Sequence, residues 1–190
     1  MKVFPFCCRF LVFIWACSLS LSCARKPRPA DLLNTLPAGQ AKVLITLDGQ
    51  AFYPDESSFS GAIQVFDNYF RLSLFDQYEG NVVIALGGEK WYSPHPVKRQ
   101  IFVENQLAAS VLIGKLIDKE KRLGEGYLMT DGEVSVDALS EDRLVLHFSG
   151  KAGKYNVQRE PEKWNQVEGT IVYKKPAITV QNVEKAAVYF

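Results

Sequence analysis

Short runs of alternating apolar and polar residues, separated by turn residues, fill the chain from position 41 onward. Val43, Ile45 and Leu47 occupy every second position of the first run, and Asp48-Gly49 then supplies a turn signal. No window from 41 to 190 keeps apolar residues at helical spacing over three turns, and only residues 31–36 favour one short helical turn. The pattern therefore predicts a chain built from strands.

The clearest predicted hairpin joins residues 61–66 to residues 69–75 through a two-residue Asp67-Asn68 turn. The expected pairs are Phe66 with Tyr69, Val65 with Phe70, Gln64 with Arg71 and Ile63 with Leu72. This register collects the aliphatic and aromatic residues on one face and the polar pair on the other. Because a slip of one residue would turn every core residue outward, the agreement between register and polarity supports the pairing.

A second hairpin is expected between residues 133–137 and 143–148. Its pairs would be Asp137 with Arg143, Val136 with Leu144, Val134 with Leu146 and Glu133 with His147. Further strands are expected at 81–86, 100–104, 109–117, 126–129, 167–174, 177–181 and 186–190. With roughly ten to twelve short strands in all, the sequence predicts a single all-β domain over 41–190, either an antiparallel β-sandwich or a small closed β-barrel.

The first 23 residues form a different kind of segment. Lys2 and Arg9 lie in a short basic head, residues 10–21 are almost entirely apolar, and Ser22 precedes Cys23. The apolar run is too short to cross hydrocarbon comfortably, and a basic head with a small-residue exit is typical of an export signal. An uncleaved anchor helix or an ordinary signal peptide remains the alternative.

The end of this segment resembles the lipobox of bacterial lipoproteins. The usual box has Leu and then Ser or Ala where this chain has Ser20 and Leu21, and the Ser-x-Ser-Cys form is similar to the looser boxes of Bacteroidota lipoproteins. The resemblance implies that residues 1–22 are removed and that Cys23 carries acyl chains that hold the protein at a membrane. Residues 23–40 are expected to form a linker to the domain, because Pro27 and Pro29 favour extended backbone. All four cysteines lie at or before position 23, which fits acylation of the last one.

The residues beside Cys23 indicate where the anchor would be. Ala24 is not an aspartate, which by resemblance to proteobacterial sorting favours the outer membrane. Arg25-Lys26 differs from the acidic stretch of surface-exported Bacteroidota lipoproteins. We therefore expect a bacterial cell-envelope protein, anchored in the outer membrane and facing the periplasm.

The charge balance and the reactive residues of the chain limit the functions that we expect of it. With 22 basic and 21 acidic residues, the chain has no large net positive charge that would attract nucleic acid. Its two histidines, His95 and His147, have no partner at metal-ligand spacing, so no metal site is expected. No nucleophile elbow, phosphate loop or other catalytic motif occurs, so we expect neither a cofactor nor enzymatic activity.

Aromatic residues beside charged or proline-containing segments are the remaining candidates for a contact site. Trp91, Tyr92 and His95 lie close together in the sequence, and Trp164 follows an acidic segment. Such rings can stack on a sugar or on a partner protein, or they can cap the open end of a barrel.

Three functions follow from these features. The leading hypothesis is a lipid-anchored, non-enzymatic binding or scaffolding domain, whose partner would be an envelope protein, a glycan or an apolar ligand. The alternative is a lipocalin-like carrier that holds an apolar ligand inside a closed barrel. A carbohydrate-active enzyme that uses loop carboxylates is a distant third.

Overall fold

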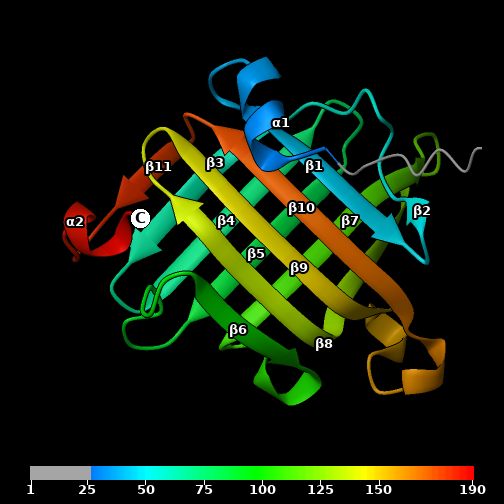
Figure 1. The fold of residues 1–190 in the computed structure, drawn as a ribbon. Helices are drawn as coiled ribbons and strands as arrows, with labels where there is room; N and C mark the ends of the chain where they lie inside the picture. Colours follow the sequence, from blue (N-terminus) through cyan, green and yellow to red (C-terminus); the bar gives the residue numbers. More distant parts are fainter. Residues whose placement is uncertain (1–26) are drawn as a thin grey trace, which may run out of the picture.

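The computed structural model, in which residues 27–190 are described, is a closed antiparallel barrel of eight strands with three further strands outside it (Figure 1). The barrel strands are β1 (Gln40–Leu47), β3 (Phe59–Phe66), β4 (Tyr69–Asp76), β5 (Asn81–Gly87), β7 (Ala109–Asp118), β8 (Leu123–Leu139), β9 (Arg143–Lys154) and β10 (Asn165–Lys174). The all-β prediction is confirmed, and of the two predicted architectures the chain adopts the barrel. The expected signal at 1–22 and Cys23 lie outside the described residues.

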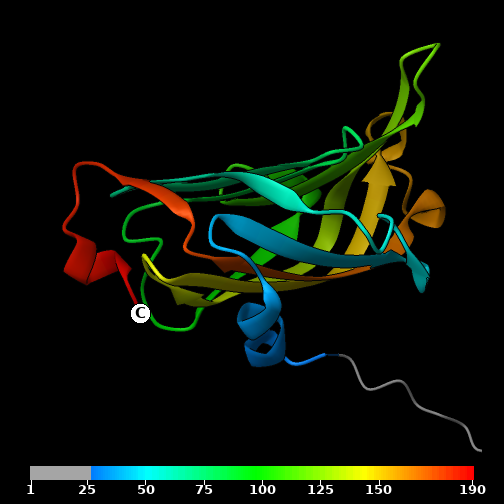
Figure 2. The same cartoon turned by 90° about the horizontal axis from the view of Figure 1, so that it is seen from above.

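Each barrel strand pairs with its neighbour along the chain, and β1 pairs with β10 over its whole length to close the ring. Only Ala41 and Phe59 join β1 to β3, so this seam is the thinnest part of the barrel. The extra strands are β2 (Gln50–Ala51) beside β1, β6 (Val97–Phe102) beside β8, and β11 (Ala177–Val180), which runs parallel to β3. Figure 2 shows a flattened barrel, with β1, β9 and β10 in one layer and β3, β4 and β5 in the other.

The hairpin β3–β4 has the predicted register, with Ile63 opposite Leu72 and Phe66 opposite Tyr69. The predicted register of β8 and β9 is wrong by two residues, because Val136 lies opposite Leu146 and Val134 opposite Phe148. The strand continues to Leu139, and the register shifts between Val136 and Ala138. A shift of two residues leaves every side chain on its predicted face.

Other boundaries also differ from the prediction. The expected strands 126–129 and 133–137 are parts of the single strand β8, and residues 186–190 contain helix α2 (Lys185–Val188) instead of a strand. Two adjacent alanines favour this helix. Helix α1 (Pro29–Thr35) overlaps the helical turn expected at 31–36 and packs on β10 from outside, where Val172 is fully buried (Figure 2).

Two facing glycines allow β8 and β9 to approach each other closely. Gly132 and Gly150 lie opposite each other, with φ of 135° and 151°, values that favour glycine. A Cβ atom on Gly132 would lie 2.2 Å from the Ser149 carbonyl oxygen. A larger residue at either position would push these two long strands apart.

Large apolar side chains from every barrel strand fill the interior. Among the fully buried ones are Ile63, Leu72, Leu74, Val82, Ile84, Val136, Leu144, Leu146 and Ile171. The ring contacts Phe52–Tyr53, Tyr53–Phe59 and Phe52–Tyr127 close one end, and buried Trp91 and Val188 close the other. The barrel interior is therefore a packed core.

Among residues 27–190, no helix has the length and apolar character needed to cross a bilayer.

Candidate functional site

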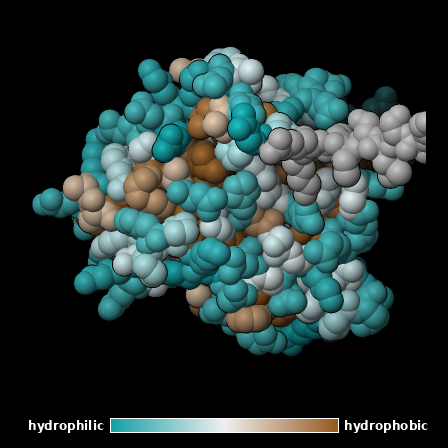
Figure 3. Space-filling view, viewed as in Figure 1, coloured by the Kyte–Doolittle hydropathy of each residue, from teal (hydrophilic) through white to brown (hydrophobic). Residues whose placement is uncertain are grey.

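A groove of about 520 Å³ crosses the outer face of β1, β10, β9 and β8. Outward-facing residues form its floor: Lys42, Leu44, Thr46, Glu168, Thr170, His147, Ser149, Glu133 and Ser135. Pro27 and Pro29 form one wall, and Tyr53, Pro54 and Asp55 form another. The space-filling view of this face shows mostly polar side chains with apolar patches between them (Figure 3).

A second, more open depression continues from the first at Ser135 and His147, which line both. Its other residues are His95, Pro96, Lys98, Asp137 and Phe190. We refer to the two depressions together as the outer groove. It runs from the start of α1 to the segment that contains Phe190.

Strand register arranges the floor of the outer groove in two rows that run across the strands. One row pairs Leu44 with Thr170, Thr170 with His147, His147 with Ser135, and Ser135 with Lys98. The other pairs Thr46 with Glu168, Glu168 with Ser149, Ser149 with Glu133, and Glu133 with Gln100. Because neighbouring strands lie about 4.8 Å apart, each row spans about 20 Å.

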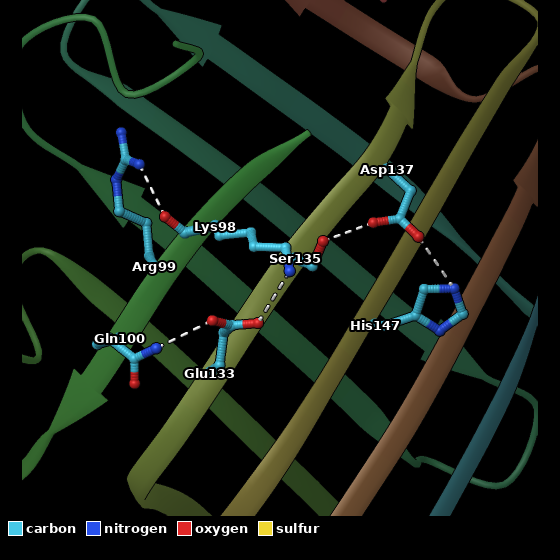
Figure 4. A network of polar contacts seen from close by, with 7 residues as sticks. All are labelled: Lys98, Arg99, Gln100, Glu133, Ser135, Asp137 and His147. Carbon is cyan, nitrogen blue, oxygen red and sulfur yellow. Dashed lines mark hydrogen bonds and ion pairs between the residues drawn. The ribbon is translucent and has the colours of Figure 1, made fainter. Parts of the chain in front are cut away.

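Within these rows the polar groups contact one another (Figure 4). The carboxylate of Glu133 accepts from the amide of Gln100 at 2.9 Å and lies 3.7 Å from the ammonium of Lys98. The carboxylate of Asp137 accepts from the hydroxyl of Ser135, and its other oxygen lies 3.3 Å from Nε2 of His147. The side chains stay partly open to solvent, with His147 36% and Asp137 42% exposed.

His147 also contacts Thr170, whose Oγ1 lies 2.9 Å from Nδ1 of the imidazole. Asp137, His147 and Thr170 thus stand in the order carboxylate, imidazole, hydroxyl, which is the order of a hydrolytic triad. A hydrolase also needs N–H donors for the oxyanion. Since β10 is paired on both edges, the backbone N–H groups beside Thr170 are engaged in the sheet. These contacts hold the three side chains in place.

The wall near β2 is fixed by two hydrogen bonds, one of them from a buried phenol. The hydroxyl of Tyr53 donates to the Asn81 carbonyl at 2.7 Å, and burial of this phenol raises the pKa of Tyr53 well above its usual range. The ammonium of Lys42 donates to the carbonyl of Asp55. This end of the groove is therefore held in a defined shape.

The opposite end carries a pair of stacked rings. The ring centroids of His95 and Phe190 are 3.9 Å apart, with 14° between their planes. The backbone N–H and C=O of Phe190 both bond to Leu139 at 2.9 Å, which fixes the ring at the end of β8. His95 is exposed, so this stack presents an aromatic surface to the groove.

The four aromatic candidates from the sequence do not form one site. Trp91 is fully buried, donates from Nε1 to the Phe66 carbonyl at 2.9 Å and packs on Phe70, which is the capping role that the sequence left open. Tyr92 is half-buried and donates to Asp67 at 3.0 Å, and both its burial and this contact raise the pKa of Tyr92. Only His95 lines the outer groove.

Trp164 lies at the other end of the barrel from Trp91, in the connection between β9 and β10. Its Nε1 donates to the Val157 carbonyl at 3.2 Å, and its ring packs over Gly153. Sequence reasoning missed Ser135, Asp137 and Thr170 as site residues and placed His147 only on a solvent face. The sequence marks these residues only as outward-facing positions on strands, a property that many surface residues share.

Residues 27–190 contain no group of three or more His, Cys, Asp or Glu side chains that could hold a metal ion. Comparisons of the chain with protein-family models, curated proteins and solved structures found no match. The outer groove must therefore be interpreted from its own chemistry.

Proposed function

We propose that this chain is a lipid-anchored protein of a bacterial cell envelope, and that its barrel is a non-enzymatic binding domain that uses the outer groove. One observation carries the proposal: the barrel interior is packed with side chains, whereas the outer face has a groove of ordered polar groups. A ligand can reach such a groove without any opening of the fold.

The packed interior argues against the carrier alternative. A lipocalin-like carrier needs space inside its barrel for an apolar ligand. Here Phe70, Leu72 and Ile84 are fully buried among the other core residues, and aromatic rings close both ends. A lipid inside this barrel would have to displace well-packed side chains.

The proposed anchor would keep the groove near the bilayer. Cys23 precedes Pro27 by only four residues, and an extended chain spans at most about 3.5 Å per residue. Because Pro27 and Pro29 form a wall of the groove, the acylated end of the chain would be within about 14 Å of that wall. A ligand bound there would be held at the membrane surface, which we propose is the periplasmic face of the outer membrane.

Detergent phase separation combined with mass spectrometry of the mature N-terminus tests the anchor. The wild-type chain should enter the detergent phase and begin at an acylated Cys23, whereas the Cys23→Ala variant should carry no acyl chain. Recovery of an unacylated mature chain that begins elsewhere would overturn the proposed anchor.

Organic extraction of the purified Cys23→Ala protein separates a binding domain from a carrier. We expect no lipid at a stoichiometric ratio to the protein, because the core has no room for one. A bound lipid released in equimolar amount would favour the carrier and contradict a binding function that depends on the outer groove.

A further inference from the structure

We propose that the outer groove binds a neutral, hydroxyl-rich glycan chain that lies across the strands, along the two rows of polar side chains. This inference rests on the proposed function, in which the groove is the binding site, and it names the class of ligand. It follows from the charge, the hydrogen-bonding groups and the aromatic surface of the groove.

Acidic side chains outnumber basic ones in the groove, whose lining includes Asp55, Glu133, Asp137 and Glu168 against Lys42 and Lys98. Lys98 lies 3.7 Å from Glu133 and offsets part of this charge. The groove therefore presents an excess of negative charge. An acidic ligand would be repelled by this excess, whereas a neutral one can bind beside these groups.

The hydrogen-bonding groups suit hydroxyls. Ser135 and Thr170 can each donate and accept, the carboxylates of Glu133 and Asp137 only accept, and the amide of Gln100 does both. Apart from Asp137, which lies beside Val136 at the register shift, these groups lie at intervals along rows of about 20 Å. A sugar hydroxyl also donates and accepts, so a chain of several sugar units can satisfy such a row repeatedly.

The stacked rings of His95 and Phe190 add an apolar surface at one end of the rows. An aromatic face offers a flat surface on which the C–H face of a sugar ring can stack. The rows and the stack together provide the polar and apolar contacts that a pyranose ring needs.

A peptide fits this groove less well. One common way for an extended peptide to bind is to add a strand to an unpaired sheet edge, with its side chains in alternate pockets. The groove floor instead lies on the face of β8, β9 and β10, which are paired on both edges. The geometry thus favours a ligand recognised through its own hydroxyls over one recognised through its backbone.

Isothermal titration of the Cys23→Ala protein with neutral oligosaccharides tests the proposal. The probes are gluco-, xylo-, manno- and N-acetylglucosamine oligomers long enough to span a row, with oligogalacturonate as the acidic comparison. We expect at least one neutral series to bind and oligogalacturonate to bind more weakly.

Two tryptophan variants provide the matched comparison. Thr170→Trp fills the groove floor, whereas Thr179→Trp places the same side chain on an exposed position of β11 outside the groove. Thr170→Trp should weaken binding by about tenfold or more, and Thr179→Trp should bind like the parent. His147→Gln, which keeps a polar side chain but removes the imidazole, gives a second test should Thr170→Trp fail to fold.

Several results would contradict the glycan proposal. They are the absence of binding by every neutral series at about 10 mM, equal loss of binding in both tryptophan variants, or preference for oligogalacturonate. Cross-linking of a partner to the wild-type protein in native envelopes, but not to Thr170→Trp, would then show that the groove is still a binding site. In that case the assignment of its ligand as a glycan would be wrong. Cleavage of a bound oligosaccharide would support the ligand and overturn the non-enzymatic function.

Discussion

The hydroxyl of Tyr173 on β10 donates to the carbonyl of Gly61 on β3 at 2.7 Å. This contact lies in the seam of the barrel, because the ladder between β3 and β11 begins at Ala62 and Phe59 is the only residue of β3 paired with β1. A buried phenol thus completes the hydrogen bonding of β3 on the edge that faces away from β4, at a position that neither β1 nor β11 reaches.

Tyr173→Phe should destabilise the fold by about 1–2 kcal/mol, because the Gly61 carbonyl would lose its partner while the ring still fits. Urea denaturation followed by circular dichroism measures the change. Tyr155→Phe is the control, since Tyr155 is 87% exposed. Equal midpoints for the two variants would show that the seam does not depend on the phenol.

Trp91→Ala should cost about 3–5 kcal/mol, the usual range for truncation of a buried aromatic residue. The ring is fully buried and contacts Phe70 at 5.0 Å between centroids, and its Nε1 bonds to Phe66. Thermal unfolding measures the loss. A variant of unchanged stability that binds ligand poorly would instead assign Trp91 to ligand contact.

Gly132→Ala should destabilise the barrel by several kcal/mol, because a Cβ atom there would meet the Ser149 carbonyl and the backbone has a positive φ. Gly126→Ala in the same strand is the matched control, since its Cβ would lie 3.6 Å from its nearest neighbour. Chemical denaturation of both variants gives the comparison. The prediction fails if both substitutions cost the same.

Tyr53 should make the fold sensitive to alkali. Burial raises the pKa of Tyr53, while a tyrosine in the unfolded chain ionises near pH 10. Above about pH 10 the unfolded state therefore binds fewer protons than the folded state, so the free energy of unfolding falls with rising pH, by up to about 1.4 kcal/mol per pH unit for this group. Below pH 10 the group contributes no pH dependence.

Tyr53→Phe should remove that slope at the cost of about 1 kcal/mol at neutral pH, because the bond to the Asn81 carbonyl is lost. Urea denaturation at a series of pH values from neutral to alkaline measures both effects. Tyr155→Phe should keep the wild-type slope. Parallel curves for wild type and Tyr53→Phe above pH 10 would refute the assignment.

The pairing of consecutive strands was predictable from the sequence, but its register was predictable only where a short turn fixes it. The hairpin between Phe66 and Tyr69 has the predicted register because a two-residue turn fixes it. The register between Val136 and Leu146 was missed because the shift beside Ala138 has no clear signature in the sequence. The buried faces were nevertheless predicted correctly, since alternation depends only on whether a position is odd or even.

The outer groove depends on pairings that the sequence does not reveal. Thr170 lies beside His147 only because β10 pairs with β9, and Leu44 joins the row only because β1 pairs with β10. His95 was a candidate because it lies between prolines, but its contact with Phe190 unites segments from distant parts of the chain. Conversely, the position of Trp91 beside a charged segment left both a contact role and a capping role open, and the ring turns inward to close one end of the barrel.

The pairing of β1 with β10 also has a consequence for how the chain acquires its structure. Leu47 meets Val167 and Gln40 meets Lys174, so the sheet cannot become a ring until the chain has been made as far as β10. Chains dominated by contacts between distant residues fold slowly. Slow folding leaves time for a polypeptide to pass through a translocation channel while it is still extended, and it also leaves strand edges open to aggregation until the last barrel strand arrives.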